Sequence, residues 1–293
     1  MFLLLSCLCL ELLSSLCFHK VKGESYSNTV EIFKDKLASS SYNPRIRPVV
    51  NQSAVLVVHV AFELVSIVEL NDVQQSFTCN GFLVLRWTDE NLVWDPAQYG
   101  GQAVIHPVPQ DIWRPRVVVM NTLGDRDPFA DDFSPIFLTS QGHVTWVPGS
   151  LFLTSCELDL TNYPFDTQVC TIKIVAMTVT LDEMQFQVYS NKVDTNFFTT
   201  NGQWDLIDTS INTSSLYAES ISMSSFEMRL VMKRRSTFLL IDIILPVVFL
   251  SFLNLMVFVI PEDSGEKIGY GITVLLALTV YMSIVSSMLP NSS

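Results

Sequence analysis

Two long apolar segments near the C-terminal end constrain this chain most strongly. They run from Thr237 to Ile260 and from Ile268 to Leu289, and a short polar turn, residues 261–267, separates them. Each segment is long enough to cross a bilayer, where a helix satisfies its own backbone hydrogen bonds. The sequence therefore predicts a transmembrane region over residues 236–293: a helix at 237–260, a turn at 261–267 and a second helix at 268–289.

The N-terminal end indicates which side of the membrane the rest occupies. Residues 1–23 form a short apolar run followed by small and polar residues, which is typical of a secretory signal peptide. Glu11 interrupts the run, but the run is too short for a comfortable anchor. We expect residues 24–235 to be extracellular. The positive-inside rule disagrees, because Lys233-Arg234-Arg235 then lies outside, so this basic group needs another role.

The extracellular part has the pattern of a β domain. Residues 27–38 predict a short amphipathic helix, and short alternating runs bounded by turn residues follow it. The predicted strands lie within residues 55–68, 82–87, 117–120, 143–147, 169–175, 184–188 and 226–232. The predicted fold class is a mainly β, immunoglobulin-like sandwich of about ten strands, with a short N-terminal helix, followed by a transmembrane α-helical hairpin.

The cysteines indicate one disulfide bond in this domain. Cys156 and Cys170 enclose Tyr163-Pro164-Phe165-Asp166, and Cys79 is the other cysteine beyond the signal region. An oxidising compartment favours a disulfide between Cys156 and Cys170, with Cys79 as a buried free thiol. Closing this loop removes roughly 3 kcal/mol of unfolded-chain entropy. By spacing alone, the pair equally suits a stapled hairpin in any secreted β domain. Asn51 and Asn212 begin glycosylation sequons, which agree with secretion.

Composition excludes several functions. The net charge of −12 lacks the basic footprint that nucleic-acid binding requires. His59, His106 and His143 are scattered without ligand spacing, and no Gly-rich phosphate loop or nucleophile motif occurs. Asp131-Asp132 is interpreted as a solvated acidic turn. We therefore predict no enzyme, no cofactor and no metal site.

The second apolar segment carries a stripe of residues at spacings of three and four, which share one helical face. The stripe consists of Glu266, Gly269, Thr273, Leu276, Val280, Ser283 and Ser287. One interpretation is a helix-packing face built of small residues. The other is a pore lining, in which a ring of Glu266 attracts cations and a girdle of Leu276 and Val280 closes the pore by dewetting.

Residues 261–283 resemble the pore-lining region of nicotinic acetylcholine receptor subunits, within the Cys-loop pentameric ligand-gated channels. The Gly265-Glu266-Lys267 step resembles the cation-selective members. Further motifs match the family in order: Trp87-Thr88-Asp89, Trp113-Arg114-Pro115, Trp146-Val147-Pro148-Gly149, the Cys156–Cys170 loop, Gly202-Gln203-Trp204-Asp205-Leu206 and Lys233-Arg234-Arg235. The resemblance covers roughly residues 27–290.

The resemblance implies a pentamer with agonist sites between extracellular sandwiches, where aromatic rings hold an amine by cation–π contact. The implied partners are a small-molecule neurotransmitter (acetylcholine or another amine), other receptor subunits in a homo- or hetero-pentamer, and membrane lipid. The implied location is the plasma membrane, as a multi-pass and postsynaptic protein with an extracellular N-terminal domain.

The ligand-binding candidates implied by position are Phe82, Met120, Trp146, Met177, Tyr217 and Met223. Met120 and Met177 stand where the family has Tyr and Trp, and Arg116 replaces the Asp of a Trp-x-Pro-Asp motif. Met223 lies near a second Tyr position, and no adjacent Cys pair accompanies Tyr217. The principal face is therefore not built as an acetylcholine cage, whereas Phe82 replaces the usual Trp of the complementary face.

The resemblance also implies residues that couple the sandwich to the pore: Asp72, Val73, Phe165, Asp166 and Arg234. A buried acid–arginine contact there would explain the basic group outside the membrane.

Family members continue with two more transmembrane helices, so the chain is expected to be either a truncated product or a partial sequence. Three functions stay open. The first is a subunit of a neurotransmitter-gated cation channel with a non-standard agonist site. The second is a truncated, non-conducting subunit that modulates full-length partners. The third is a ligand-sequestering binding protein.

Overall fold

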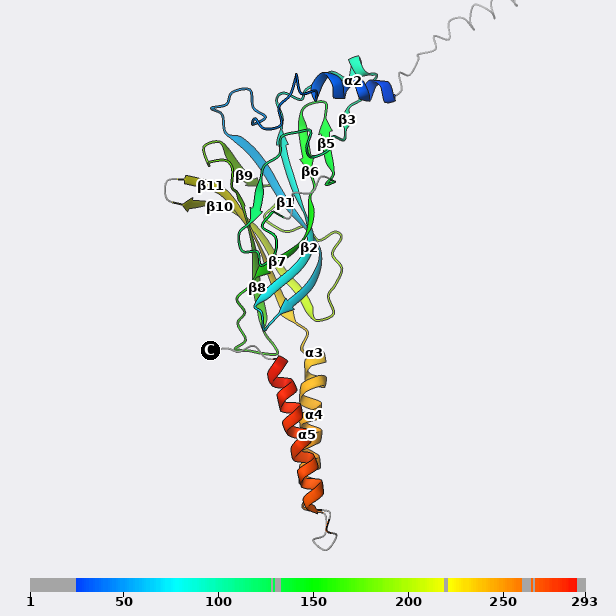
Figure 1. The fold of residues 1–293 in the computed structure, drawn as a ribbon, viewed down its shortest axis with the longest axis vertical. Coiled ribbons are helices and arrows are strands. Elements are labelled where there is room, and N and C mark those ends of the chain that lie inside the picture. The colour runs from blue at the N-terminus through cyan, green and yellow to red at the C-terminus, as the bar shows by residue number, and fades with distance from the viewer. Residues whose placement is uncertain are drawn as a thin grey trace, which may run out of the picture.

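The chain forms a long β-sandwich that stands on a pair of helices (Figure 1). This computed structural model describes residues 25–127, 129, 133–218, 221–259, 265 and 267–288. The predicted signal peptide, the acidic turn Asp131-Asp132 and Glu266 lie outside the described residues.

The sandwich begins with helix α2 (Tyr26–Lys36), which Ser25 caps by accepting a hydrogen bond from the backbone N–H of Asn28. The elements that follow are β1 (Leu56–Asn71), β2 (Ser76–Thr88), η1 (Pro96–Tyr99), β3 (Val104–Ile105), β4 (Val117–Val119), β5 (Ile136–Thr139), β6 (His143–Trp146), β7 (Gly149–Ser155), β8 (Thr167–Ala176), β9 (Met184–Val188), β10 (Trp204–Ala218) and β11 (Ile221–Arg234).

Two sheets face each other in the sandwich. Within the described residues, one sheet has seven strands in the order β3-β5-β6-β2-β1-β9, with β7 also paired to β2, and the other has four in the order β10-β11-β8-β4. The strand pairs are antiparallel except β1–β9. This architecture confirms the predicted β-sandwich with an N-terminal helix and C-terminal helices.

The core lies between the sheets because each strand alternates in burial, as a period of two requires. On β1 the side chains of Val58, Val60 and Phe62 are fully buried, whereas their neighbours are partly exposed. Phe186 and Phe226 meet edge to face, with ring centroids 4.9 Å apart, and join the two sheets. Burying such side chains removes apolar surface from water, which is the main stabilising contribution.

The helices below the sandwich are α3 (Ser236–Leu239), a π-helical turn η2 (Leu240–Ile244), α4 (Leu245–Met256) and α5 (Lys267–Met288). The sequence predicted one regular helix over 237–260. The π-helical turn has a physical cause, because Pro246 lacks the N–H that would bond to residue 242.

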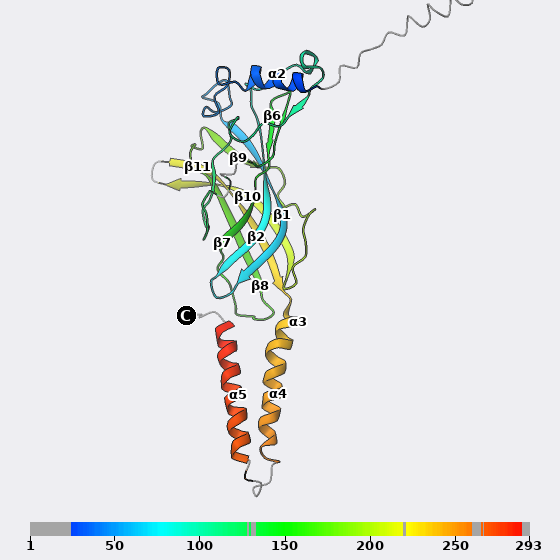
Figure 2. The same cartoon turned by 45° about the vertical axis from the view of Figure 1, so that its right-hand side comes forward.

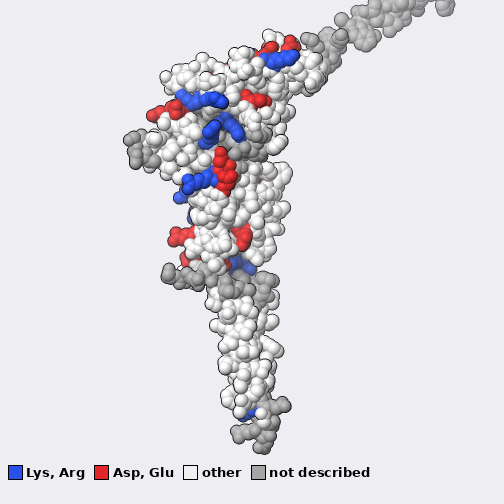
Figure 3. Space-filling model, viewed as in Figure 1, with Lys and Arg blue, Asp and Glu red and all other residues white. Residues whose placement is uncertain are grey.

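Helices α4 and α5 run side by side in both views (Figure 2). Among the described residues, one helix is long and apolar enough to cross a membrane: residues Lys267–Ser286 of α5, with a mean hydropathy of 2.0. Helix α4 is apolar but shorter. The charged residues visible in Figure 3 lie almost entirely on the sandwich.

Candidate coupling site and agonist face

A buried arginine joins three chain segments where the sandwich meets the helices. The Nε of Arg234 donates to Oδ1 of Asp166 at 2.8 Å, and its Nη2 donates to Oδ2 of Asp166 at 3.1 Å and to Oδ1 of Asp72 at 2.9 Å. The side chains of Arg234 and Asp166 are 8% and 1% exposed. Arg234 is the last residue of β11, Asp166 lies in the Cys156–Cys170 loop, and Asp72 lies in the turn between β1 and β2. These three residues form the Arg234 cluster.

Aromatic rings enclose the Arg234 cluster. The guanidinium carbon lies 4.2 Å from the centroid of the buried Trp204 ring and 5.0 Å from that of Tyr163. Burial alone would lower the pKa of Arg234, but hydrogen bonds to Asp166 and Asp72 outweigh it and raise this pKa. Burial also raises the pKa of Tyr163. The arginine therefore stays charged, held by two carboxylates in a site that largely excludes water.

The position of this cluster follows from the local sequence. Helix α3 begins at Ser236, two residues after Arg234, so the cluster sits at the start of the helical part. The neighbouring Arg235 instead makes an exposed ion pair with Asp205. Val73 and Phe165, also predicted to couple the two parts, are exposed on the same two loops that supply Asp72 and Asp166.

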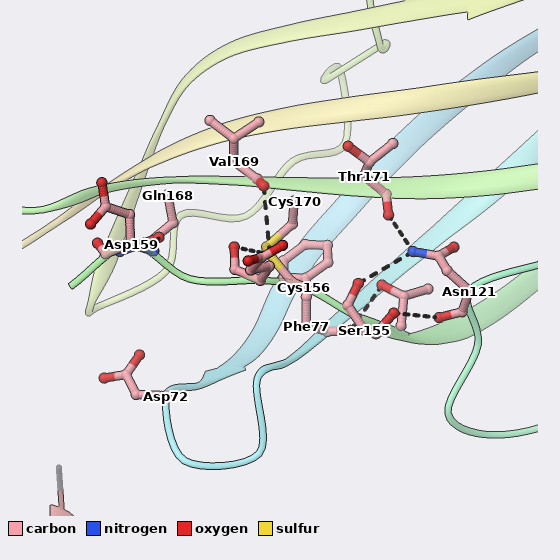
Figure 4. The surroundings of a disulfide bond; sticks show 12 residues. Asp72, Phe77, Asn121, Ser155, Cys156, Asp159, Gln168, Val169, Cys170 and Thr171 are labelled. Carbon is pink, nitrogen blue, oxygen red and sulfur yellow. Dashed lines mark hydrogen bonds between the residues drawn. A yellow bond between two sulfur atoms is a disulfide. The ribbon is translucent and has the colours of Figure 1, made fainter. Parts of the chain in front are cut away.

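The predicted disulfide is present and anchors one of these loops. Cys156 and Cys170 are bonded (Figure 4). Cys79 is a buried free thiol, and burial raises its pKa. Asn121 ties the surrounding strands together. Its Nδ2 donates to the carbonyl of Thr171 at 2.7 Å, and its Oδ1 accepts from the N–H of Lys173 at 3.0 Å. The residue that follows Met120 is therefore fixed to β8.

The principal-face candidates Met120 and Met177 lie on the four-stranded sheet, at the end of β8 away from the Cys156–Cys170 loop. Val117 pairs with Ala176, and the N–H of Met177 donates to the carbonyl of Arg116 at 3.3 Å. Directly opposite residues share a face of the sheet, so Arg116 lies beside Met177. Lys173 lies beside Met120 in the same way, since the Met120 N–H donates to the Lys173 carbonyl at 2.8 Å. Methionine and cationic side chains thus stand together here.

The hairpin of β10 and β11 separates two predicted ligand residues. Leu216 pairs with Met223, whereas Tyr217 pairs with Ser222. Because neighbouring residues point to opposite faces, Tyr217 and Met223 do not share a face. Tyr217 is 75% exposed. Leu216, which sequence reasoning missed, lies opposite Met223. Only the register of the hairpin reveals the position of Leu216, because a search of the sequence for aromatic rings selects Tyr217 instead.

The two remaining ligand candidates lie elsewhere. Trp146 is 1% exposed, and its Nε1 donates to Oγ of Ser134 at 2.7 Å, so its ring belongs to the core. Phe82 lies partly exposed on β2 in the other sheet, paired with Gly149. A side chain at Gly149 would collide with the Phe82 ring. Phe82 is therefore on a separate face from Met120 and Met177.

The stripe on α5 points away from α4. Tyr270, Val274, Leu278 and Tyr281 form the more buried face of α5, and the Tyr270 hydroxyl donates to the Leu253 carbonyl of α4 at 2.9 Å. The described stripe residues on the other face are all exposed: Gly269, Thr273, Leu276, Val280 and Ser283. The stripe is thus not the face that packs on α4. Glu266 lies outside the described residues, and so does the side chain of Ser287.

The chain matches two consecutive family regions. Residues 31–236 match the neurotransmitter-gated ion-channel ligand binding domain, and residues 243–293 match the neurotransmitter-gated ion-channel transmembrane region. The chain belongs to the neurotransmitter-gated ion-channel family. Members of this family are channels rather than enzymes, and membership places the sandwich outside the plasma membrane.

Individual relatives are acetylcholine receptor subunits. The chain is 33% identical over 256 residues to acetylcholine receptor subunit beta-like 1 of Drosophila melanogaster, covering 86% of this chain and 49% of that one. It is 33% identical over 294 residues to neuronal acetylcholine receptor subunit alpha-6 of Rattus norvegicus, covering 98% and 58%. The chain thus spans about half the length of the curated relatives it matches. This confirms the predicted Cys-loop, nicotinic-receptor-like membership.

Proposed function

We propose that this chain serves as a subunit of a pentameric, cation-conducting neurotransmitter-gated channel with a non-standard agonist site. In this proposal residues 1–23 are a signal peptide, 24–235 the extracellular ligand-binding domain and 236–293 the transmembrane region. Asn51 and Asn212, both exposed, would carry glycans. A postsynaptic location and a hetero-pentamer with other receptor subunits belong to the same proposal.

The single observation that carries the proposal is the Arg234 cluster. A buried, doubly paired arginine is poor evidence for stability but suits a switch, because breaking it exposes an uncompensated charge. It bonds the Cys156–Cys170 loop and the β1–β2 turn to the residue that leads into α3. Movement of either loop therefore pulls directly on the first membrane helix.

The agonist face supports a role different from that of an acetylcholine-binding principal subunit. Met120 and Met177 offer no aromatic face, and Arg116 and Lys173 add positive charge beside them. Glu227 of β11 lies opposite Lys173, but among these residues an amine cation finds no aromatic ring to hold it by cation–π contact. Phe82 retains a ring on β2, so we propose that this subunit lends a complementary face to a neighbour with an aromatic principal face.

The orientation of α5 supports the pore assignment. In a five-fold assembly the face away from α4 is free to line the axis. Glu266 would then form a ring of carboxylates at the inner end of the pore, which attracts cations and repels anions. The girdle of Leu276 and Val280 would close the pore by excluding water.

A matched pair of leucines tests this assignment. Leu275 and Leu276 are 61% and 64% exposed in the chain and point about 100° apart on the helix. The chain is co-expressed with nicotinic subunits, and agonist-evoked currents are recorded. Leu276→Thr is expected to shift the agonist dose–response curve, and Glu266→Ala to lower cation selectivity in reversal potentials. Leu275→Thr is the control and should leave both unchanged.

Equal effects of Leu275→Thr and Leu276→Thr would contradict the assignment of the stripe as a pore lining. The stripe would then be interpreted as a helix-packing face. Unchanged reversal potentials with Glu266→Ala would contradict the cation ring. Ser287→Glu adds a carboxylate at the outer end and is expected to raise calcium permeability.

A further inference from the structure

An arginine-lined cavity lies in the sandwich where the turn of residues 43–46, the segment 109–116 and Phe129 meet. Its volume is about 460 Å³. The lining residues used below are Arg45, Arg114, Arg116, Asp127, Phe129 and Trp146. Among the described lining residues, three guanidinium groups stand against one carboxylate. Since the chain has a net charge of −12, this concentration of positive charge is a local exception.

The backbone places two of these arginines side by side. Trp113 and Pro115 are buried while Arg114 and Arg116 are more exposed, so the segment alternates in burial as an extended chain does. Arg114 is held in place: its Nη1 donates to the carbonyl of Phe129 at 3.1 Å. Its guanidinium carbon also lies 5.3 Å from the centroid of the Trp146 ring. Arg114 is therefore a fixed positive charge that covers the buried Trp146 ring on the inner side of the cavity.

The neighbouring agonist face also carries charged side chains, and Glu227 of β11 lies directly opposite Lys173 there. Arg116 lies beside Met177, and Lys173 lies beside Met120. Guanidinium groups are planar forks that bind carboxylate and related oxyanions through paired hydrogen bonds, and they keep their charge at any physiological pH. A cavity of this volume is large enough for a small organic molecule.

We propose that this cavity binds a small organic anion, whose carboxylate or sulfonate lies against Arg45 and Arg116. The proposal concerns the extracellular sandwich alone. It holds whether or not the chain contributes to a conducting channel, and its test measures binding rather than current. Asp131 and Asp132 lie outside the described residues and enter no step of it.

Calorimetric titration of the full chain in a neutral detergent tests the proposal with three probes of one shape. These are naphthalene-2-sulfonate, the neutral 2-naphthylmethanol and the cationic 2-naphthylmethylammonium. The sulfonate is expected to bind at least about tenfold more tightly than the neutral probe, because charge-assisted hydrogen bonds are the strong ones. The ammonium probe is expected to bind most weakly.

Arginine variants locate the site. Arg116→Gln and Arg45→Gln are each expected to weaken sulfonate binding by about tenfold while leaving the neutral probe unaffected. Arg229→Gln is the matched control, because Arg229 is an exposed arginine of β11 outside the cavity, and it should leave binding unchanged.

Equal affinities for the three probes, or no binding of the sulfonate, would overturn the proposal. Equal losses in Arg116→Gln and Arg229→Gln would also overturn it, because they would show general attraction to surface charge. Thermal melting of each variant checks its folding. If Arg116→Gln does not fold, Arg45→Gln and the three-probe comparison on the unmodified chain decide the question.

Discussion

The two ends of the β8–β11 strand pair handle charge in opposite ways. At the membrane end, Arg234 is buried and bonded to two carboxylates, and Met232, two residues before it on β11, pairs with Gln168. Toward the other end, Lys173 of β8 is exposed beside Met120 and opposite Glu227 of β11, and Arg116, just before β4, is exposed beside Met177. The same strand pair thus connects the buried, ion-paired Arg234 cluster to an exposed face that lacks aromatic rings. The contrast teaches that the connection to the membrane and the recognition of a ligand are separate features of the sheet.

The largest expected effect on stability comes from removing the arginine of the Arg234 cluster. Arg234→Met leaves Asp166 buried without its partner, which should lower the free energy of unfolding by about 3–5 kcal/mol. Arg235→Met is the matched control, since Arg235 pairs with Asp205 at the surface, where an ion pair contributes about 0–1 kcal/mol. Chemical denaturation of the full chain measures both. Similar losses in the two variants would show that the Arg234 cluster is no more than a surface ion pair.

A smaller effect is expected from restoring rings on the exposed face that lacks them. Met120→Tyr combined with Met177→Trp should strengthen acetylcholine binding by about 2 kcal/mol if both rings face the ammonium. Adding Arg116→Asp should strengthen it further by removing a like charge. Leu151→Tyr, which adds a ring on the other sheet, is the control and should change nothing. Acetylcholine titration of the purified chain provides the measurement. Strong binding by the unmodified chain would contradict the account of this face.

The smallest effect concerns Glu63, a carboxylate that makes no ion pair with the described residues. Burial, and then the neighbouring Asp194 carboxylate, raises the pKa of Glu63. Between the two pKa values the folded chain binds more protons than the unfolded chain. The Glu63 carboxylate therefore lowers the stability of the fold at pH values above its raised pKa. It has no effect below the ordinary glutamate pKa of about 4.3, where Glu63 is protonated in both states. Glu63→Gln is therefore expected to stabilise the chain slightly at pH 7 and to have no effect below about pH 4.

Denaturation curves across this pH range test the sign. Glu157→Gln, at an exposed position, is the control and should leave the pH profile unchanged. A destabilising effect of Glu63→Gln at pH 7 would show that the Glu63 carboxylate makes a favourable interaction, as the Asp166 carboxylate does.

The alternation of residues and the order of motifs were enough to predict the fold class. A period of two in β1 and long, mostly apolar stretches after residue 236 leave few other solutions. The disulfide between Cys156 and Cys170 also followed from the sequence, because removal of the signal region leaves few partners. The sequence did not predict the π-helical turn at Leu240–Ile244, where the cause, Pro246, lies beyond the affected residues.

Which residues share a face was decided by the tertiary structure. Tyr217 matches a ligand position by residue type, yet the register of β10 and β11 puts Leu216 opposite Met223. Trp146 looks like a ligand residue but packs into the core, because its indole N–H finds Ser134 there.

The sequence by itself determined the class of fold, the disulfide and the apolar helices, since these depend on local pattern and on residue type. The family resemblance pointed to Asp72, Asp166 and Arg234, but only the tertiary structure showed that one guanidinium bonds both carboxylates, and only it placed Arg45 and Arg116 on one cavity. These residues are far apart along the chain, or meet across loops whose paths no local pattern specifies. Contacts of this kind form when the two sheets pack, because packing sets the register and the direction in which each loop returns.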